Sequence, residues 1–297
     1  MPVYTSDFAE LLEPTLRVVY DQEEKTWETE FDKFMTVETS KKAVETDFST
    51  TGFGIAQNYA EGASVPFDTV YRGWKKQYTH VQAGLGFIIT RIMYEDDQYR
   101  HMKQKPRALA RSLNEYVEIL CANILNRATT AGYIGGDGVV LASAVHPTIA
   151  GGTWSNTISA DLDVTSFEQA LIGIGNFINE RGLKYKAMPQ QLIVSTTDAF
   201  QAEIILKSAQ LPGVANNDYN PAKGILPKGT LVLHYLTDTD AWGVTTDAPN
   251  GLIFFWRRNK EFTNDSDWNS DNAKYKGTMR CSAGWTDPRC LVWSPGA

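Results

Sequence analysis

The chain has 297 residues, of which 42% are hydrophobic and 21% charged, and its formal net charge is −7. This composition is that of a globular protein and excludes collagen, coiled-coil and largely disordered chains. The acidity is confined to residues 1–47, with 12 acidic and 5 basic side chains, whereas the other 250 residues hold 23 of each sign. A protein that binds duplex DNA usually carries an excess of Lys and Arg, which this chain lacks.

The cysteine count and the N-terminal residues predict the cellular compartment in which the protein folds. Three cysteines without a C-x-x-C pair are typical of buried, reduced thiols rather than of a disulfide framework. The first residues lack the basic stretch and apolar run of a signal peptide, and no apolar stretch approaches the roughly 18 residues of a membrane span. We therefore expect a soluble protein that folds in the cytosol and has no membrane partner.

The first predicted element is a helical arm over residues 6–34, where apolar side chains recur at helical spacing among carboxylates. Pro14 is expected to break this arm into two pieces. Because a lone amphipathic helix is marginal in water, the arm must pack on something. An ordinary packed helix and an arm that lies across a neighbouring subunit both remain open.

Residues 50–92 have strand-like alternation interrupted by glycines, which predicts a long two-stranded excursion with a polar tip near residues 61–73. An isolated two-stranded ribbon is marginal, so the body of the protein or another chain must cover it. Next, residues 98–130 predict the longest helix, entered or bent near Pro106 and ended at Gly132. The glycines that follow lack the Lys-Ser/Thr ending of a phosphate-binding loop and fit a turn better.

A second compact unit is predicted from about Asp163 onward, and its helices and largely antiparallel strands indicate the α+β class. The expected helices are 165–181 and a capped helix at 197–208, with a strand at 191–195 between them. A loop dense in Pro, Gly, Asn and Asp follows at 211–229. Further strands are expected at 230–236, 241–246, 252–258 and 273–287.

No group of residues supports catalysis, a cofactor or a metal ion. The four histidines are far apart in the sequence and have no metal-binding pattern, and there is no nucleophile elbow or P-loop. Residues 265–271 begin like a calcium loop, but the glycine and glutamate of that motif are replaced by Ser270 and Lys276. We therefore predict no enzyme activity and no cofactor.

Residues 100–111 form the one local basic run, with five Lys or Arg and no acid. Such a run is more often a solvated face or a partner for an acidic surface than a nucleic-acid site. The obvious acidic surface is the arm, in this chain or in a neighbour. The residues expected to pair are Glu23, Glu24, Glu28 and Glu30 on the arm and Arg100, Lys103, Arg107 and Arg111 on the helix.

Four strings occur in an order that resembles the tailed-phage major capsid proteins, with the Hong Kong ninety-seven type of shell fold. They are EGASVPFDTVYRGW, KQYTHVQAGLGFIITRIMYEDD, PGVANNDYNP and SAGWTDPRCLVWSPGA. The resemblance covers nearly the whole chain. It implies an N-terminal arm at 1–50, an extended loop at 51–97, a peripheral domain at 98–159 and 251–297 with a spine helix at 98–131, and an axial domain at 160–250.

The resemblance implies a structural subunit that assembles with itself into hexamers and pentamers of an icosahedral head enclosing phage double-stranded DNA. It also implies a separate scaffolding protein and a portal, with a decoration protein left open, and a location in the virion after assembly in the host cytoplasm. DNA would be enclosed without sequence-specific binding. An encapsulin-like compartment shell shares this fold and is the alternative; a soluble hydrolase or ligand-binding domain is a remoter one.

Aromatic and loop residues are the expected contacts between subunits, because aromatic side chains dominate such contacts. If the arm lies on a neighbour, reversing its glutamates should impair assembly more than folding. If the isolated subunits unfold instead, the arm packs on its own subunit. The expected contact residues are Trp27, Phe31, Tyr71, Trp74, Lys75, Lys76, Asn217 and Tyr219.

Overall fold

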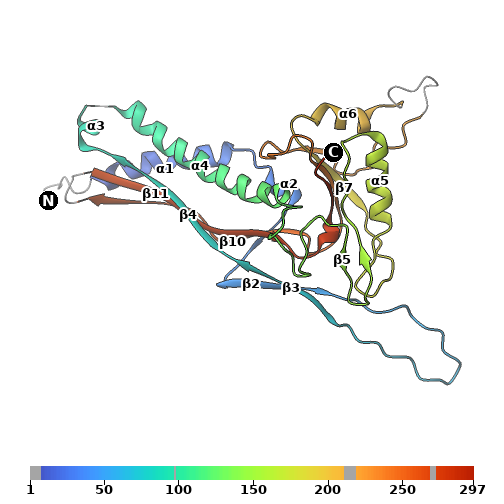
Figure 1. Ribbon diagram of the computed structural model, residues 1–297. Helices are drawn as coiled ribbons and strands as arrows, with labels where there is room; N and C mark the ends of the chain where they lie inside the picture. Colours follow the sequence, from blue (N-terminus) through green and yellow to red (C-terminus); the bar gives the residue numbers. More distant parts are fainter. Residues whose placement is uncertain (1–7, 97, 211–218, 268–271) are drawn as a thin grey trace.

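The computed structural model describes residues 8–96, 98–210, 219–267 and 272–297 (Figure 1). An elongated body is built on a long sheet, and a second unit with a shorter sheet lies at one end of it. An extended loop projects away from both. Helices lie in layers apart from the largely antiparallel sheets, which confirms the predicted α+β class.

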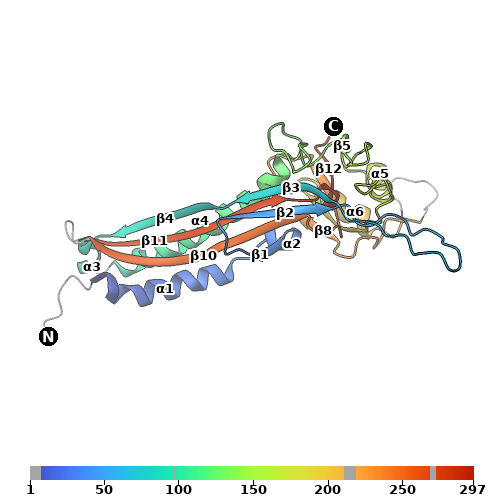
Figure 2. The ribbon, with the colours of Figure 1, turned by 90° about the horizontal axis from the view of Figure 1, so that it is seen from below.

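The long sheet has the strand order β1–β10–β11–β4 (Figure 2). Its strands are β1 (Thr36–Thr39), β10 (Leu252–Asp267), β11 (Asn272–Trp285) and β4 (Val81–Ile89). All pairs are antiparallel except β1, which runs parallel to β10. The helices α1 (Phe8–Thr26), α2 (Phe31–Phe34) and α4 (Tyr99–Asn126) cover one face, and α3 (Arg91–Glu95) joins β4 to α4.

The helix α4 corresponds to the predicted long helix, and its apolar stripe is buried against the sheet. Pro106 lies buried inside this helix and not at its start. Likewise, Pro14 lies inside α1 and does not break it, contrary to our expectation. Leu12, Leu16 and Tyr20 are buried on both sides of Pro14, so packing against α4 and the sheet outweighs the lost backbone hydrogen bond. The helix α1 therefore continues without a break to Thr26.

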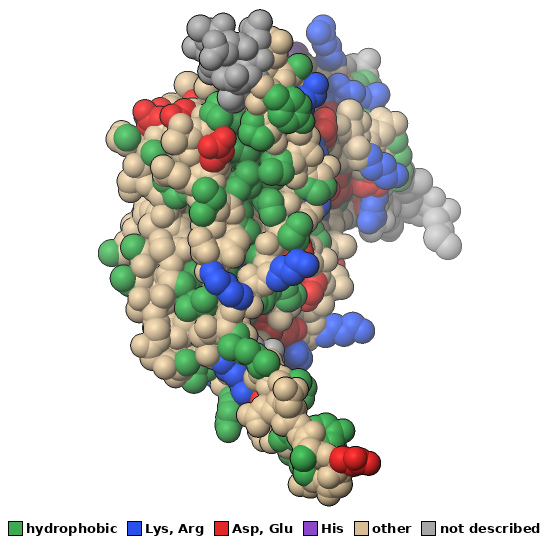
Figure 3. Space-filling model, turned by 90° about the vertical axis from the view of Figure 1, so that its right-hand side faces the viewer, with side chains coloured by type: hydrophobic (Ala, Val, Ile, Leu, Met, Phe, Trp, Pro, Cys, Tyr) green, Lys and Arg blue, Asp and Glu red, His purple; other side chains and the backbone are tan. Residues whose placement is uncertain are grey.

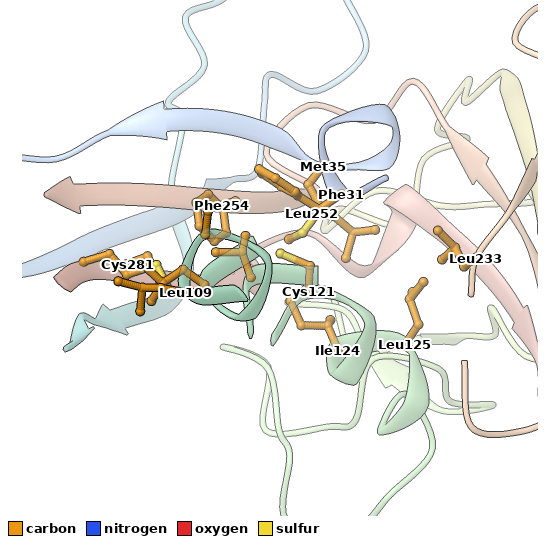
Figure 4. Packing of buried hydrophobic residues seen from close by; sticks show 14 of the residues in the cluster. Phe31, Met35, Leu109, Cys121, Ile124, Leu125, Leu233, Leu252, Phe254 and Cys281 are labelled. Atoms are coloured by element: carbon orange, nitrogen blue, oxygen red, sulfur yellow. The ribbon is translucent and has the colours of Figure 1, made fainter. Parts of the chain in front are cut away.

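The three cysteines are buried and unpaired, as the sequence predicts. Cys121 and Cys281 belong to the same core, between α4 and the long sheet (Figure 4). Burial raises the pKa of Cys281 to about 11 and raises that of Cys121 as well. The thiolate is the reactive form, so these thiols should be inert in the folded chain.

We therefore expect the folded protein to react with a thiol-specific aromatic disulfide reagent at pH 8 on the order of 100-fold more slowly than a variant with an exposed cysteine at Ser155. After unfolding in denaturant, all three native thiols should react. The absorbance of the released thiolate measures both rates. Rapid labelling of a native thiol in the folded chain would contradict this burial.

The shorter sheet has the order β12–β9–β7–β8 and supports the second unit. Its strands are β7 (Pro189–Val194), β8 (Thr230–Val232), β9 (Trp242–Thr246) and β12 (Leu291–Ser294), and its helices are α5 (Val164–Gly175) and α6 (Ala199–Lys207). An Asp163–Ser166 capping box starts α5. In contrast, the expected side-chain cap on α6 is absent, because its N-cap residue Asp198 makes no such bond.

Three predicted boundaries in this part of the chain were wrong. The helix α5 ends at Gly175 rather than at residue 181, because the chain turns and Ile178 pairs with Lys184 in an isolated bridge. The strand expected at 230–236 ends at Val232, whereas the one expected at 252–258 continues to Asp267. Tertiary pairing with β11 extends that strand beyond its apolar run.

The predicted excursion is a hairpin of β2 (Val44–Thr50) and β3 (Arg72–Thr79), with residues 51–71 between the strands. It therefore starts before residue 50, and β4 belongs to the long sheet instead. Tyr78 attaches the hairpin to the sheet face that the helices leave bare, by packing edge-on to Phe255 at 5.1 Å. Short pieces β5 (His146–Pro147), β6 (Thr153–Trp154) and η2 (Pro288–Cys290) complete the chain. Within the described ranges, no helix has the length and apolarity to span a membrane.

Candidate functional site

The extended loop, residues 51–71, carries many apolar side chains that its own subunit leaves exposed. Phe67 is 97% exposed, and the loop projects from the body in the view of Figure 3. Exposed apolar groups in such number are a sign of an interaction surface. The exposed large apolar side chains of the loop are Phe53, Ile55, Tyr59, Val65, Phe67, Val70 and Tyr71.

Few contacts hold this loop to its own subunit. Arg181 donates to a carboxylate oxygen of Asp68 at 2.6 Å and also to the carbonyl oxygen of Thr69. Asp68 accepts from the backbone N–H of Gly54 at 2.7 Å, and this bond, followed by Arg181, lowers the pKa of Asp68. The guanidinium of Arg181 lies 5.5 Å from the ring centroid of Tyr71. These contacts set the direction of the loop but leave its apolar side chains in solvent.

A buried ionic network lies under the base of the loop. The indole N–H of Trp74 donates to Glu180 at 3.2 Å, and Glu180 forms a 2.9 Å ion pair with Arg289. Arg289 also pairs with Asp287 at 3.1 Å and lies 4.9 Å from the ring centroid of Trp154. The side chains of Glu180 and Arg289 are almost fully buried, so each charge depends on the other. Trp74 thus helps to anchor the loop to its own subunit.

The two lysines predicted as contact residues differ in environment. Lys75 is exposed, whereas Lys76 is half-buried, donates to the carbonyl oxygen of Ile134 at 2.7 Å, and has its pKa lowered by burial. The ammonium of Lys76 lies 4.7 Å from the ring centroid of Trp285. A Cβ atom on Gly136 would lie 2.8 Å from the backbone oxygen of Lys75, so this glycine permits the close approach of the turn to β3.

The arm is fixed to its own subunit by a carboxylate on α4. Glu118 is buried and accepts from the backbone N–H groups of Glu30 at 2.9 Å and Phe31 at 3.0 Å, at the start of α2. Burial raises the pKa of Glu118. Phe31 packs on Phe254 inside the core and is therefore unavailable to another subunit, contrary to our expectation, whereas Trp27 is half-buried.

The arm glutamates have partners within the same chain, and only Glu23 pairs with the basic run. The pairs are Glu23–Arg111 at 2.6 Å, Glu24–Lys260 at 3.4 Å, Glu28–Lys33 at 2.7 Å and Glu30–His234. Arg100, Lys103 and Arg107 are exposed and form no ion pair with a described residue. The structure therefore favours the arm that packs on its own subunit.

Charge reversal on the arm should consequently act on folding. We expect Glu23→Lys to lower the free energy of unfolding of the isolated subunit by about 1 kcal/mol, because it places two cations together at a partly buried site. Glu28→Lys, at an exposed position with a local partner, is the matched control and should leave stability unchanged. Urea unfolding measures both. Equal stability of the two variants, with assembly impaired only in Glu23→Lys, would place this glutamate in a contact between subunits.

The predicted loop of the second unit is only partly described. Tyr219 is exposed and forms an isolated bridge with Gln210. Asn217 lies outside the described residues. Exposed apolar side chains of the neighbouring helices α5 and α6 include Ile172, Phe200 and Ile204. Figure 3 shows further hydrophobic side chains gathered on the face of the molecule from which the extended loop projects.

The buried His146 has a carboxylate partner as in a catalytic dyad, but a substrate cannot reach it. His146 Nδ1 lies 2.7 Å from Asp137, and its Nε2 lies 3.0 Å from the amide oxygen of Asn156. The amide nitrogen of Asn156 donates to the carbonyl oxygens of Leu141, Pro288 and Leu291, which fixes its orientation. The histidine and its carboxylate partner are buried, so this network joins chain segments and has no access to a substrate.

Comparison with solved structures shows which fold this is. The chain is similar to a virus-like particle protein from Pyrococcus furiosus (10% identity, 94% of this chain and 97% of that chain, TM-score 0.56). It is also similar to the Gordonia phage Cozz structure (10% identity, 92% and 90%, TM-score 0.54) and to the capsid of an empty GTA particle (11% identity, 91% and 90%, TM-score 0.54). None of the curated protein sequences matches it.

The family follows from the sequence itself. A model of the phage capsid protein family matches residues 74–294, which include most of β3, the long-sheet strands β4, β10 and β11, the shorter sheet and α4. The exposed loop agrees with a structural subunit. The chain therefore belongs to the phage capsid protein family and is a structural subunit of a phage capsid.

Proposed function

We propose that copies of this chain join as hexamers and pentamers into an icosahedral head that encloses double-stranded DNA. The observation that carries this proposal is the extended loop, whose apolar side chains its own subunit leaves exposed. Such a loop becomes stable when a neighbouring copy covers it, and obligate interfaces of this kind bury more than about 2,000 Å².

We propose the following division of the chain. Residues 1–50 are the arm, 51–97 the extended loop, 98–159 and 251–297 the peripheral domain, and 160–250 the axial domain. In support, α4 is the longest helix of the described chain and packs on the long sheet, while α5 and α6 belong to a separate core. The hairpin strand β2, at Val44–Thr50, shares its sheet with β3 and so belongs with the loop rather than with the arm.

The proposed partners are other copies of the chain, a separate scaffolding protein, a portal and, as an open case, a decoration protein. Assembly would take place in the host cytoplasm. DNA would be confined without sequence-specific binding, because residues 48–297 have no net charge and the acidic excess lies in the arm. A strongly basic inner surface of the assembled shell would contradict this. We propose no enzymatic role.

The proposed contact residues are those that the subunit leaves accessible. On the hairpin they are Tyr71 in the loop and Lys75 in β3, both exposed, and in the second unit Tyr219. Trp27 remains a proposed contact of the arm through its half-buried ring. Trp74 and Lys76 serve mainly to hold the loop base, because both already have partners in their own subunit.

Electron microscopy of the purified protein, alone and with its scaffolding protein, tests this function. We expect capsomer rings or closed particles. An encapsulin-like compartment is not favoured, because the matching family is that of phage capsids. Persistent monomers in both samples, with a small ligand that stabilises the fold, would instead indicate a soluble binding protein or hydrolase.

A further inference from the structure

The outer strand β4 of the long sheet lacks the features that normally protect a sheet edge. It forms the margin of the sheet beyond β11, and among the described residues it has no strand on its other side. Its nine residues, VQAGLGFII, contain no charge and no proline. Natural edge strands are usually short, charged or interrupted by proline, because free backbone groups recruit other chains. The opposite edge, β1, has only four residues and carries the exposed Glu38.

Alternate residues of β4 direct their backbone groups outward, away from β11. The carbonyl oxygen of Ile88 accepts from Lys105 at 2.6 Å and therefore points away from β11. In an antiparallel ladder, residues of the same parity point to the same side, so Gln82 and Gly86 direct their N–H and C=O groups outward as well. Val81 and Leu85, on the helix side of the strand, are 51% and 53% exposed. The edge thus offers both hydrogen bonds and apolar contacts.

A matching segment lies in the extended loop. Residues 51–60, TGFGIAQNYA, are uncharged like β4, and Phe53 and Ile55 alternate with small residues in a strand-like pattern. The loop cannot reach β4 of its own chain. It leaves the start of β3 on one side, whereas β4 continues from the end of β3 toward α3 at the far end of the body (Figure 1). The segment and the edge can therefore meet only between two copies.

We propose that residues 53–59 of one copy add as a strand to the β4 edge of the next copy. This inference rests on the proposed function and specifies which element receives the loop and how. Strand addition supplies backbone hydrogen bonds from the edge and side-chain contacts from alternate residues. Because the two surfaces differ, the contact runs head to tail, and contacts of this kind close into rings when the rotation permits.

Disulfide trapping tests the proposal. The variant Ile55→Cys with Leu85→Cys should form covalent ladders under mild oxidation in assembled particles, because paired strands bring Cα atoms within the roughly 4.4–6.8 Å that a disulfide needs. The native thiols do not interfere, since all three are buried. Because strand register decides the match, Ile55→Cys is also paired with Val81→Cys. Ile55→Cys with Ile172→Cys, an exposed position on α5, is the matched control.

Covalent ladders for either β4 pair, without ladders for the α5 control, are the expected result on a non-reducing gel. Particles that assemble but give no ladder with either β4 pair would overturn the proposal, while leaving the capsid function intact. A second variant, Leu85→Lys, places a charge on the edge without disturbing the core, because this side chain is exposed. Its melting temperature should be unchanged and its particle yield at least about tenfold lower. Normal assembly of Leu85→Lys would likewise contradict strand addition.

Discussion

Replacing Arg289 by alanine should lower the free energy of unfolding by about 3–5 kcal/mol, the largest effect that we expect from a single substitution. The arginine is buried between Glu180 and Asp287, and its removal would leave both carboxylates without their cation. The same substitution removes the support for Trp74, which donates to Glu180 at the base of the loop. Urea unfolding of the isolated subunit measures the loss.

Arg181→Ala is the matched control, because this arginine also holds the loop but is partly exposed together with its partner Asp68. Its effect on stability should stay below about 1 kcal/mol, as for other surface ion pairs. Hydrogen exchange should nevertheless increase at Gly54, which donates to the same carboxylate. Equal loss of stability in the two variants would show that burial does not make the Arg289 network contribute more to the free energy of unfolding than the exposed Arg181–Asp68 pair does.

Phe67→Ser should impair assembly while leaving the isolated subunit as stable as before. The side chain is 97% exposed, so its loss costs the monomer nothing, whereas covering it with a neighbouring copy would contribute about 2 kcal/mol per contact. The protein concentration at which particles form should therefore rise by at least about tenfold. Light scattering and electron microscopy measure particle yield as the concentration is varied.

Glu61→Ser, at the exposed tip of the same loop, controls for changes in loop composition and should assemble normally. Unfolding curves of both variants should coincide with that of the unmodified chain. If Phe67→Ser assembles at the unmodified concentration, the exposed loop does not bind a neighbour through this side chain. A lowered melting temperature would indicate that the loop already packs on its own subunit.

The elements with strong local patterns could be predicted from the sequence. The apolar spacing in α4 corresponds to its buried face, and the unpaired cysteines are buried in the core. The acidic arm could also be recognised, but its course past Pro14 could not. That course depends on Leu16 and Tyr20 packing into the core formed by α4 and the long sheet, where Tyr20 stacks on Phe262 of β10, far along the sequence. Long-range packing overrode the local preference.

The residues that fix the loop and the arm carry no local signal. Glu118 lies 87 residues from Phe31, and Glu180 lies 109 residues from Arg289. In the sequence, an isolated Glu or Arg in these segments is indistinguishable from a solvated charge. The sequence did mark one contact near the base of the loop. This was the glycine pair at 135–136, which we assigned to a turn and in which Gly136 also lies against β3. Contacts of this kind become visible only once the chain is folded.

The central claim is that the extended loop joins one capsid subunit to the next. Electron cryomicroscopy of assembled particles tests it most directly, because it locates residues 51–71 relative to every neighbouring copy. We predict that these residues lie on an adjacent subunit and that Phe67 is buried there. A map in which the loop folds back on its own subunit, or projects free of all neighbours with Phe67 in solvent, would contradict the claim.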